Sequence, residues 1–113
     1  MDCIFCKLAQ GEIPTDVLYE DEEIFVFTDQ NPQAPVHFLA IPKKHIASLN
    51  EADADDAALL GRLLLRIRQI AEDEGFAADG YRVVNNIGQD GGQSVAHIHF
   101  HVLAGRSLQW PPG

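Results

Sequence analysis

Three histidines stand at alternate positions near the end of the chain, in the sequence H-I-H-F-H over residues 97–101. In an extended strand, side chains two apart point to one face at intervals of roughly 6–7 Å, so His97, His99 and His101 would line up. Closely placed imidazoles disfavour one another's protonation, which keeps at least one of them neutral near pH 7. A neutral imidazole is a nucleophile or a metal ligand. The pattern therefore predicts histidine-based catalysis, with a metal site on the three histidines as the rival interpretation.

A glycine-rich segment, residues 88–92, leads into the histidines through Gln93 and Ser94. Glycine lets backbone N–H groups crowd into an anion-binding concavity, and Ser94 adds a hydroxyl donor. Phosphoryl or nucleotidyl transfer needs an anion site beside a nucleophile, because its catalysis is mostly positioning and charge stabilisation. The segment is not a Walker loop, since the G-K-[ST] ending is missing. Taken alone, a Gly-Gly pair is most often an ordinary turn.

Cys3 and Cys6 form a C-x-x-C pair, which is half of a tetrahedral zinc site. His45 is the first candidate for a further ligand. The alternative is a pair of reduced thiols packed near the N-terminus. For His37 and His45 individually, a hydrogen-bonded side chain near a strand end is the commoner role of a single histidine.

The elements that must position these groups can be predicted from the periodicity of apolar residues. β-Branched and aromatic residues predict five strands, at Val17–Glu20, Ile24–Thr28, His37–Ile41, Tyr81–Asn85 and Val95–Leu103. The last strand places Ile98, Phe100 and Val102 toward a core, opposite the histidines.

One long helix is predicted between the third and fourth strands, ending at Gly75. Ser48 with Glu51 has the form of a capping box, although the start could lie nearer Asp53. The core-facing residues of this helix recur at helical spacing: Leu60, Leu63, Leu64, Ile67, Ile70 and Ala71. Strands around one helix predict an α+β fold, a five-stranded antiparallel sheet with one long helix in a single domain over residues 1–113.

The charge balance argues against a general nucleic-acid or acidic-membrane binder. The chain has 113 residues, with 17 acidic and 8 basic side chains and a net charge of −9, whereas such binders carry a basic face. Neither a secretory signal nor an apolar run of ~20 residues is present, so we expect a cytoplasmic protein without a membrane partner.

The sequence H-I-H-F-H-V-L resembles the signature of the histidine triad (HIT) family, in which three histidines alternate with apolar residues. The similarity extends to A-P-V-H-F-L-A-I-P-K-K-H-I from Ala34, N-I-G-Q-D-G-G-Q-S-V from Asn86 and the closing Q-W-P-P-G, which look like the Hint branch. The resemblance covers most of the chain. It implies a HIT-like fold and a homodimer, with the long helix and the strand after it at the interface.

The same resemblance implies an activity, hydrolysis of the P–N bond of purine nucleoside 5′-phosphoramidates of the AMP-amine or AMP-lysine type. His99 would attack the α-phosphorus and form a covalent nucleotidyl-histidine, which water then resolves. His101 would hydrogen-bond the phosphate and support proton transfer, while His37 would help orient His99. His97 completes the triad, and no cofactor is expected for catalysis.

Binding residues are implied in the same way. Asn86, Gly92, Gln93 and Ser94 would contact phosphate, and Asp29 would take the ribose hydroxyls. An apolar slot would hold the purine, and its residues are Ile4, Phe5, Leu8, Phe27 and Leu39. The C-terminal tail would bring Trp110 to the partner's site as a recognition residue. A structural zinc would be held by Cys3, Cys6, His45 and His97. Gln30 stands where the branch more often has an apolar residue, which leaves the base preference open.

Two other functions stay open. One is a nucleotide-binding regulatory protein that keeps the fold without catalysis. The other is a diadenosine polyphosphate hydrolase of another HIT branch, against which the G-R-x-x-x-W-P-P-G ending speaks.

Overall fold

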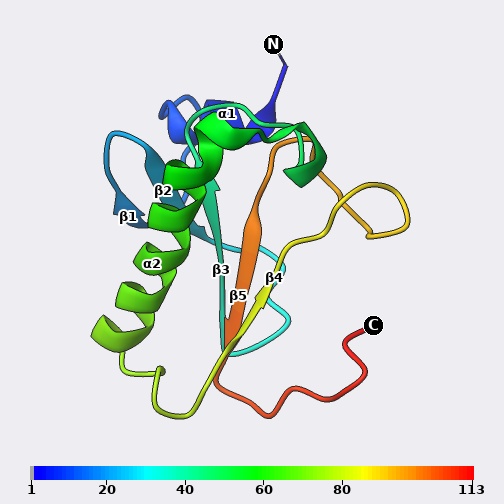
Figure 1. Ribbon diagram of the computed structural model, residues 1–113. Coiled ribbons are helices and arrows are strands. Elements are labelled where there is room, and N and C mark those ends of the chain that lie inside the picture. The colour runs from blue at the N-terminus through cyan, green and yellow to red at the C-terminus, as the bar shows by residue number, and fades with distance from the viewer. Residues whose placement is uncertain (1) are drawn as a thin grey trace.

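Five strands form one antiparallel sheet in the computed structural model, which describes residues 2–113 (Figure 1). In chain order the elements are α1 (Ile4–Ala9), β1 (Val17–Glu20), β2 (Ile24–Thr28), β3 (Val36–Pro42), α2 (Ala57–Asp73), β4 (Arg82–Val84) and β5 (Phe100–Ala104). The strand order is β1-β2-β3-β5-β4, and every neighbouring pair is antiparallel. The predicted five-stranded α+β fold is therefore confirmed.

The last strand begins later than predicted, at Phe100 instead of Val95. Ala40 pairs with Phe100, so continuing this register would place Pro42 opposite Ile98. Proline has no N–H to donate to a ladder, and the pairing ends there. The N–H of Ile98 donates instead to the carbonyl oxygen of Ile46, at 2.6 Å. The alternation of faces nevertheless runs on, because Ile98, Phe100 and Val102 are all buried in the core under α2.

The long helix is preceded by two short 3-10 turns, Leu49–Glu51 and Ala54–Asp56. Ser48 caps the first turn, and Asp53 forms a capping box with Asp56 in the second. Both predicted start signals are therefore used, but each begins a 3-10 turn rather than α2 itself.

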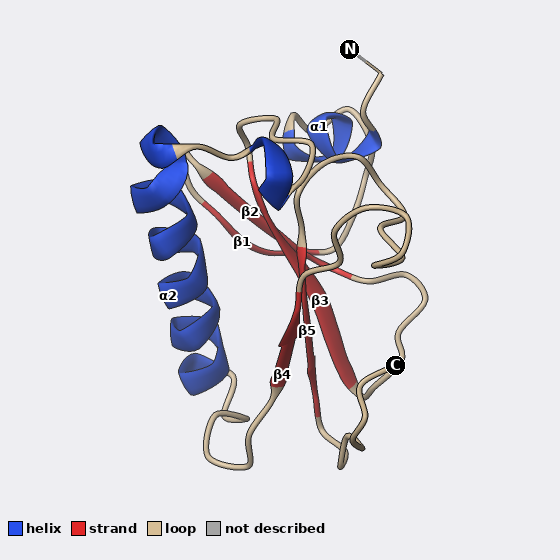
Figure 2. Cartoon of the chain, turned by 45° about the vertical axis from the view of Figure 1, so that its right-hand side comes forward, coloured by secondary structure: helices blue, strands red, loops and turns tan. Residues whose placement is uncertain are grey.

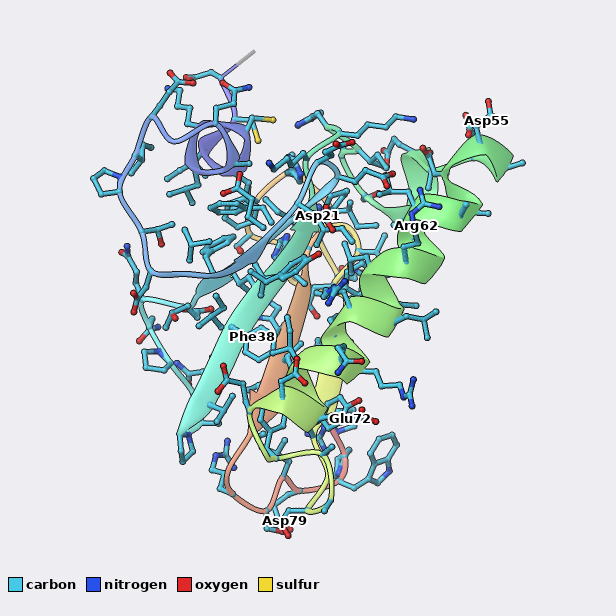
Figure 3. All side chains as sticks on the ribbon, turned by 90° about the vertical axis from the view of Figure 1, so that its left-hand side faces the viewer. Asp21, Phe38, Asp55, Arg62, Glu72 and Asp79 are labelled. Atoms are coloured by element: carbon cyan, nitrogen blue, oxygen red, sulfur yellow. The ribbon has the colours of Figure 1, made fainter. Side chains whose placement is uncertain are left out.

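The buried stripe of α2 differs from the prediction at three positions. It consists of Leu59, Leu63, Ile67, Ile70 and Ala71. Leu64, which was expected to face the core, is 46% exposed, Leu60 is only partly buried, and Leu59 was not anticipated. The reason is geometric: α2 packs on the sheet through the row of Leu59, Leu63 and Ile67, and Leu64 lies on the flank of this row, where it remains in solvent. Figure 3 shows Arg62 and Glu72 along α2, beside the strand that carries Phe38.

On the opposite face, one end of the sheet is covered by α1, the short helix at the N-terminus (Figure 2). Phe5 and Leu8 pack on a second buried cluster, formed by Phe25, Phe27, Leu39 and Ile41 of β2 and β3. With both faces covered, β3 is buried over almost its whole length. Because side chains alternate along a strand, the odd-numbered residues of β3 lie on the α1 side, as Leu39 and Ile41 show. The three histidines of residues 97–101 lie on the same side.

In the part of the chain that the structure describes, no helix is both long enough and apolar enough to span a membrane.

Candidate active site

His99 is held by the main chain two residues earlier. Its Nδ1 lies 2.7 Å from the carbonyl oxygen of His97. A carbonyl can only accept, so Nδ1 carries the proton, and Nε2 of the neutral ring has a free lone pair. The ring is only 3% exposed and packs edge-on against Phe5, with ring centroids 5.0 Å apart. His99 is thus a fixed imidazole with its Nε2 in the nucleophilic state.

His101 and His37 form a second hydrogen-bonded pair, with 2.9 Å between Nδ1 of His101 and Nε2 of His37. The backbone N–H of Gln33 donates to Nδ1 of His37 at 3.0 Å, so the proton of neutral His37 is on Nε2. His37 therefore donates to His101, and His101 keeps its own proton on Nε2. Asp29 lies beside the pair, with Oδ2 at 3.3 Å from Nε2 of His37 and 3.8 Å from Nδ1 of His101.

This arrangement corrects the expected role of His37. We expected His37 to orient His99, but its ring bonds His101, and the carbonyl of His97 orients His99. The sheet register explains the pairing. Leu39 lies opposite His101 in the β3–β5 ladder, which makes His37 a diagonal neighbour of His101 on the same face.

Burial lowers the pKa of His101 below its ordinary value, and the neighbouring His99 and His37 lower that pKa further, while Asp29 opposes the shift. Desolvation disfavours the charged imidazolium, and nearby imidazoles repel a second proton. His101 is thereby kept neutral near pH 7, the state in which its Nε2 donates and its Nδ1 accepts.

His97 faces away from this pair, toward the two cysteines. Its Nε2 lies 2.8 Å from the carbonyl oxygen of Pro42, so Nε2 carries the proton and Nδ1 is a free ligand atom. Nδ1 is 3.4 Å from Sγ of Cys3 and 3.5 Å from Sγ of Cys6. Nδ1 of His45 is 3.4 Å from Sγ of Cys6. The structure therefore brings all four expected zinc ligands together, with their donor atoms within 4.8 Å of one another.

The donor set fits a tetrahedral zinc ion. Two sulfur and two imidazole ligands with usual Zn–S and Zn–N bond lengths would be about 3.5 Å apart along a tetrahedron edge. The measured separations of 3.4–3.5 Å match this spacing. The bond from His97 Nε2 to Pro42 also fixes the ring in the orientation that a metal ligand requires. Burial and the adjacent Cys3 raise the pKa of the Cys6 thiol, so a cation at this place would be needed to hold thiolates.

The glycine-rich loop lies next to the histidine segment and is braced by Gln93. The Gln93 side chain donates to the carbonyl oxygens of Ala47 and Val95 and accepts from the N–H of Gly88. Gly91 has no room for a side chain, because a Cβ would lie 2.3 Å from the carbonyl oxygen of Ile87. The loop is thus shaped by its own backbone, and Gln93 is positioned as a brace.

The remaining predicted phosphate residues lie on or beside this loop. Gly92 and Ser94 are exposed and Asn86 is half-buried. Ser94 lines a cavity of about 580 Å³ together with Cys3, Ile4 and His45. Neither Asn86 nor Ser94 forms a side-chain hydrogen bond to a histidine among residues 2–113.

Four of the expected purine-slot residues, Phe5, Leu8, Phe27 and Leu39, are buried together beside His99. Ile4 is exposed at the edge of this cluster. Trp110 is 82% exposed in the C-terminal tail, which runs on the β4 side of the sheet, where Arg82 donates to the carbonyl oxygen of Gln109 at 2.8 Å (Figure 1). The structure of one chain therefore does not bring Trp110 to the histidines.

Besides the carbonyl of His97 on His99, three contacts of the site were not predicted. They are the carbonyl of Pro42 on His97, the N–H of Gln33 on His37 and the side-chain amide of Asn85, which donates to the carbonyl of His99 at 2.9 Å. The groups that Pro42 and Gln33 supply are main-chain atoms that nearly all residues share, and so leave no signal in the sequence. Only Asn85, next to the predicted Asn86, could have been singled out.

Comparisons with known proteins agree with this geometry. A family model described as "Scavenger mRNA decapping enzyme C-term binding" matches residues 2–109. A HIT-like protein of Synechococcus elongatus is 55% identical over 112 residues, covering 99% of this chain and 97% of that protein.

Solved structures show the same fold. A HIT family hydrolase from Legionella pneumophila Philadelphia 1 superposes with a TM-score of 0.97 at 53% identity, over 99% of this chain and 100% of that one. A histidine triad protein from Clostridium difficile has a TM-score of 0.94 at 48% identity, over 96% and 95% of the two chains.

The lowered pKa of His101 predicts how stability depends on pH. The unfolded chain binds a proton on this imidazole at its ordinary pKa of about 6.5, whereas the folded chain binds it only at lower pH. The contribution to stability is complete above about pH 6.5 and is lost as the pH falls toward the folded pKa. We expect the free energy of unfolding, measured with urea in the presence of a chelator, to decrease from about pH 7.5 to about pH 5.5. The variant His101→Gln should show a shallower decrease, and equal slopes would contradict the prediction.

Proposed function

We propose that this chain, which belongs to the histidine triad (HIT) family, is a hydrolase that cleaves the P–N bond of purine nucleoside 5′-phosphoramidates through a covalent nucleotidyl-histidine on His99. The observation that carries the proposal is the hydrogen bond from Nδ1 of His99 to the carbonyl of His97. With the proton on Nδ1, the lone pair of Nε2 is the one that can attack. A hydrolase function is supported by the solved relative described as a HIT family hydrolase.

The reaction proceeds in two displacements at phosphorus. In the first, Nε2 of His99 forms a bond to the α-phosphorus, the P–N bond breaks, and the amine leaves with the bonding electron pair and a proton from solvent relayed by His101. In the second, a water oxygen attacks the phosphorus, the bond to Nε2 breaks, and a water proton returns to solvent. The products are a nucleoside monophosphate and an amine. Splitting one displacement into two is the usual gain from a covalent intermediate.

His101 serves both steps through its Nε2–H, which His37 keeps in place by donating to Nδ1. A donor aimed at phosphate oxygen stabilises the negative charge of the transition state, and it does so more strongly in a buried site than in water. The purine would lie against the exposed edge of the apolar cluster at Ile4, next to the buried Phe5, Phe27 and Leu39, and Asp29 and the loop of residues 86–94 would take the ribose and phosphate.

We also infer that Cys3, Cys6, His45 and His97 hold one structural zinc ion. Zinc would bind the thiolates and clamp α1 onto the sheet; it takes no part in the displacement. A six-residue helix is too short to be stable alone, so a metal clamp at its first residues stabilises the helix that carries Phe5.

The protein is further proposed to form a homodimer through β4 and the adjacent flank of α2. β4 is an edge strand, and Val83 in its middle is exposed. Arg62 and Arg66 reach Glu23 and Tyr19 on the β1 flank of α2, so helical spacing places Leu64 on the opposite flank, toward β4. An unpaired strand edge beside exposed apolar side chains is suited to pairing with a second copy.

The variant His99→Ala is expected to lose turnover of an adenosine 5′-phosphoramidate by on the order of 10⁴-fold or more, because no other group replaces the covalent nucleophile. It should still bind AMP, measured by calorimetry. Intact-protein mass spectrometry after brief mixing and acid-free quenching should show an adenylyl adduct on the wild type alone. Unchanged turnover in the variant would refute the role of His99, and nucleotide binding by a wild type without turnover or adduct would indicate a regulatory binding protein.

Elemental analysis of the purified protein is expected to find about one zinc per chain, as a Cys₂His₂ site requires. Cys6→Ser should lose the metal and unfold at a lower temperature, since a ligand present at a thousand times its Kd stabilises a fold by about 4 kcal/mol. His99→Ala is the matched control, because it removes a histidine two positions from His97 and should retain zinc. Equal zinc content in Cys6→Ser and the wild type would contradict the assignment.

The dimer is tested by Leu64→Arg, which places a charge on the β4 flank of α2. We expect sedimentation velocity to show a dimer for the wild type and a monomer for this variant, because an unpaired charge at the centre of an interface is costly. Leu65→Arg is the control: Leu65 is more exposed, at 63%, but points away from the sheet and should leave the dimer intact. A monomeric wild type would refute the proposed assembly.

A further inference from the structure

We propose that the turn after β5, Gly105 and Arg106, is a positioning element that fixes the proton on His37 and, through it, the donor nitrogen of His101. Its effect on turnover rests on the function proposed above, but its effect on the histidine tautomer does not. The segment 33–35 leads into the sheet at the start of β3.

Two contacts hold this segment from the other side. Nε of Arg106 donates to the carbonyl oxygen of Gln33, at 3.1 Å. Gly105 has a φ of +92° and packs so closely on Pro35 that a Cβ would lie 2.9 Å from the Cβ of Pro35. Val36 and Ala104, the next residues toward the sheet, are paired in the β3–β5 ladder. Beyond the last pair of the β3–β5 ladder, the turn therefore holds the segment 33–35 by one close packing contact and one side-chain hydrogen bond.

The position of Gln33 matters because its N–H is the group that sets the His37 tautomer. That N–H donates to Nδ1 of His37 at 3.0 Å, which leaves Nε2 of His37 to donate to Nδ1 of His101 at 2.9 Å. The hydrogen bonds thus all run in one direction, from Gln33 to His37 to His101, and end in the Nε2–H of His101.

Loss of the Gln33 donor would allow the chain of bonds to reverse. A His37 ring with its proton on Nδ1 would present a bare Nε2 to His101 and to the carboxylate of Asp29, 3.3 Å away. His101 would then have to donate from Nδ1, and its Nε2 would change from a donor to an acceptor. An acceptor cannot stabilise a phosphate oxygen. Arg106 is the contact that restrains the carbonyl side of Gln33, while the neighbouring Pro32 and Pro35 have no N–H with which to anchor the loop.

The experiment compares Arg106→Ala with Arg62→Ala, a change of another exposed arginine that is ion-paired with Glu23 on α2. The ¹⁵N chemical shifts of the His37 ring report which nitrogen carries the proton, with or without substrate. In Arg106→Ala we expect a measurable Nδ1–H population on His37 and a kcat about fivefold lower at little change in KM, the factor that corresponds to the net worth of one hydrogen bond. Arg62→Ala should match the wild type in both readouts.

A third variant, Arg106→Lys, separates the hydrogen bond from the charge. Lysine keeps the positive charge but carries its donors one atom beyond the position of Nε, so it should behave like Arg106→Ala. Wild-type behaviour of Arg106→Lys alongside a slow Arg106→Ala would overturn the proposal in favour of a charge effect. An unchanged His37 tautomer in Arg106→Ala would also overturn it. A shifted tautomer in a protein without phosphoramidate turnover would support the positioning role and refute the proposed function instead.

Discussion

The site depends on one hydrogen bond, from Nδ1 of His99 to the carbonyl of His97. The carbonyl of His97 is free to accept this bond because it faces the β4 side of β5, where the β4–β5 ladder ends at Val84 and His101. The β3–β5 ladder ends at Ala40 and Phe100 because Pro42 has no N–H to offer to Ile98. Pro42 then uses its own carbonyl to bind Nε2 of His97. A single proline thus ends the β3–β5 ladder and fixes the side chain of His97 for the cysteines.

His97 consequently belongs to two networks. Its ring joins Cys3, Cys6 and His45 at the start of α1, while its carbonyl holds the ring of His99. Phe5 contacts both rings, with ring centroids 6.0 Å from His97 and 5.0 Å from His99. Whatever stabilises the cysteine cluster therefore also stabilises the orientation of His99. This gives the C-x-x-C pair a structural reason to lie so close to a site in whose chemistry it takes no part.

The two faces of the sheet divide the work of the fold. The face under α2 buries the larger apolar cluster, with Leu63, Ile67, Phe38 and Val102 at its centre, and supplies most of the stability. The other face carries a short helix, a smaller apolar cluster and His37, His97, His99 and His101. His45, which follows β3, contacts Cys6 of the short helix. Polar rings on that face are held by specific hydrogen bonds because they contribute little through burial alone. Because the apolar core under α2 holds the sheet in place, His97 keeps its contacts with the cysteines while His37 and His101 keep their mutual hydrogen bond.

The sequence by itself determined the strands, the long helix and the set of residues that gather at the site. Periodicity reports which side chains share a face, so the three histidines opposite Ile98, Phe100 and Val102 could be predicted. The place of His97 beside the cysteines was predicted from the resemblance to the HIT family instead, and His45 from the ligands that a C-x-x-C pair lacks. The tertiary structure alone decided which imidazole bonds which. That choice depends on strand register and on main-chain groups such as the N–H of Gln33 and the carbonyl of Pro42, which do not depend on the side chain of the residue that supplies them. Leu64 shows the same limit on the helix: spacing defines a stripe, but only the fit of α2 against the sheet decides which flank of the stripe is covered.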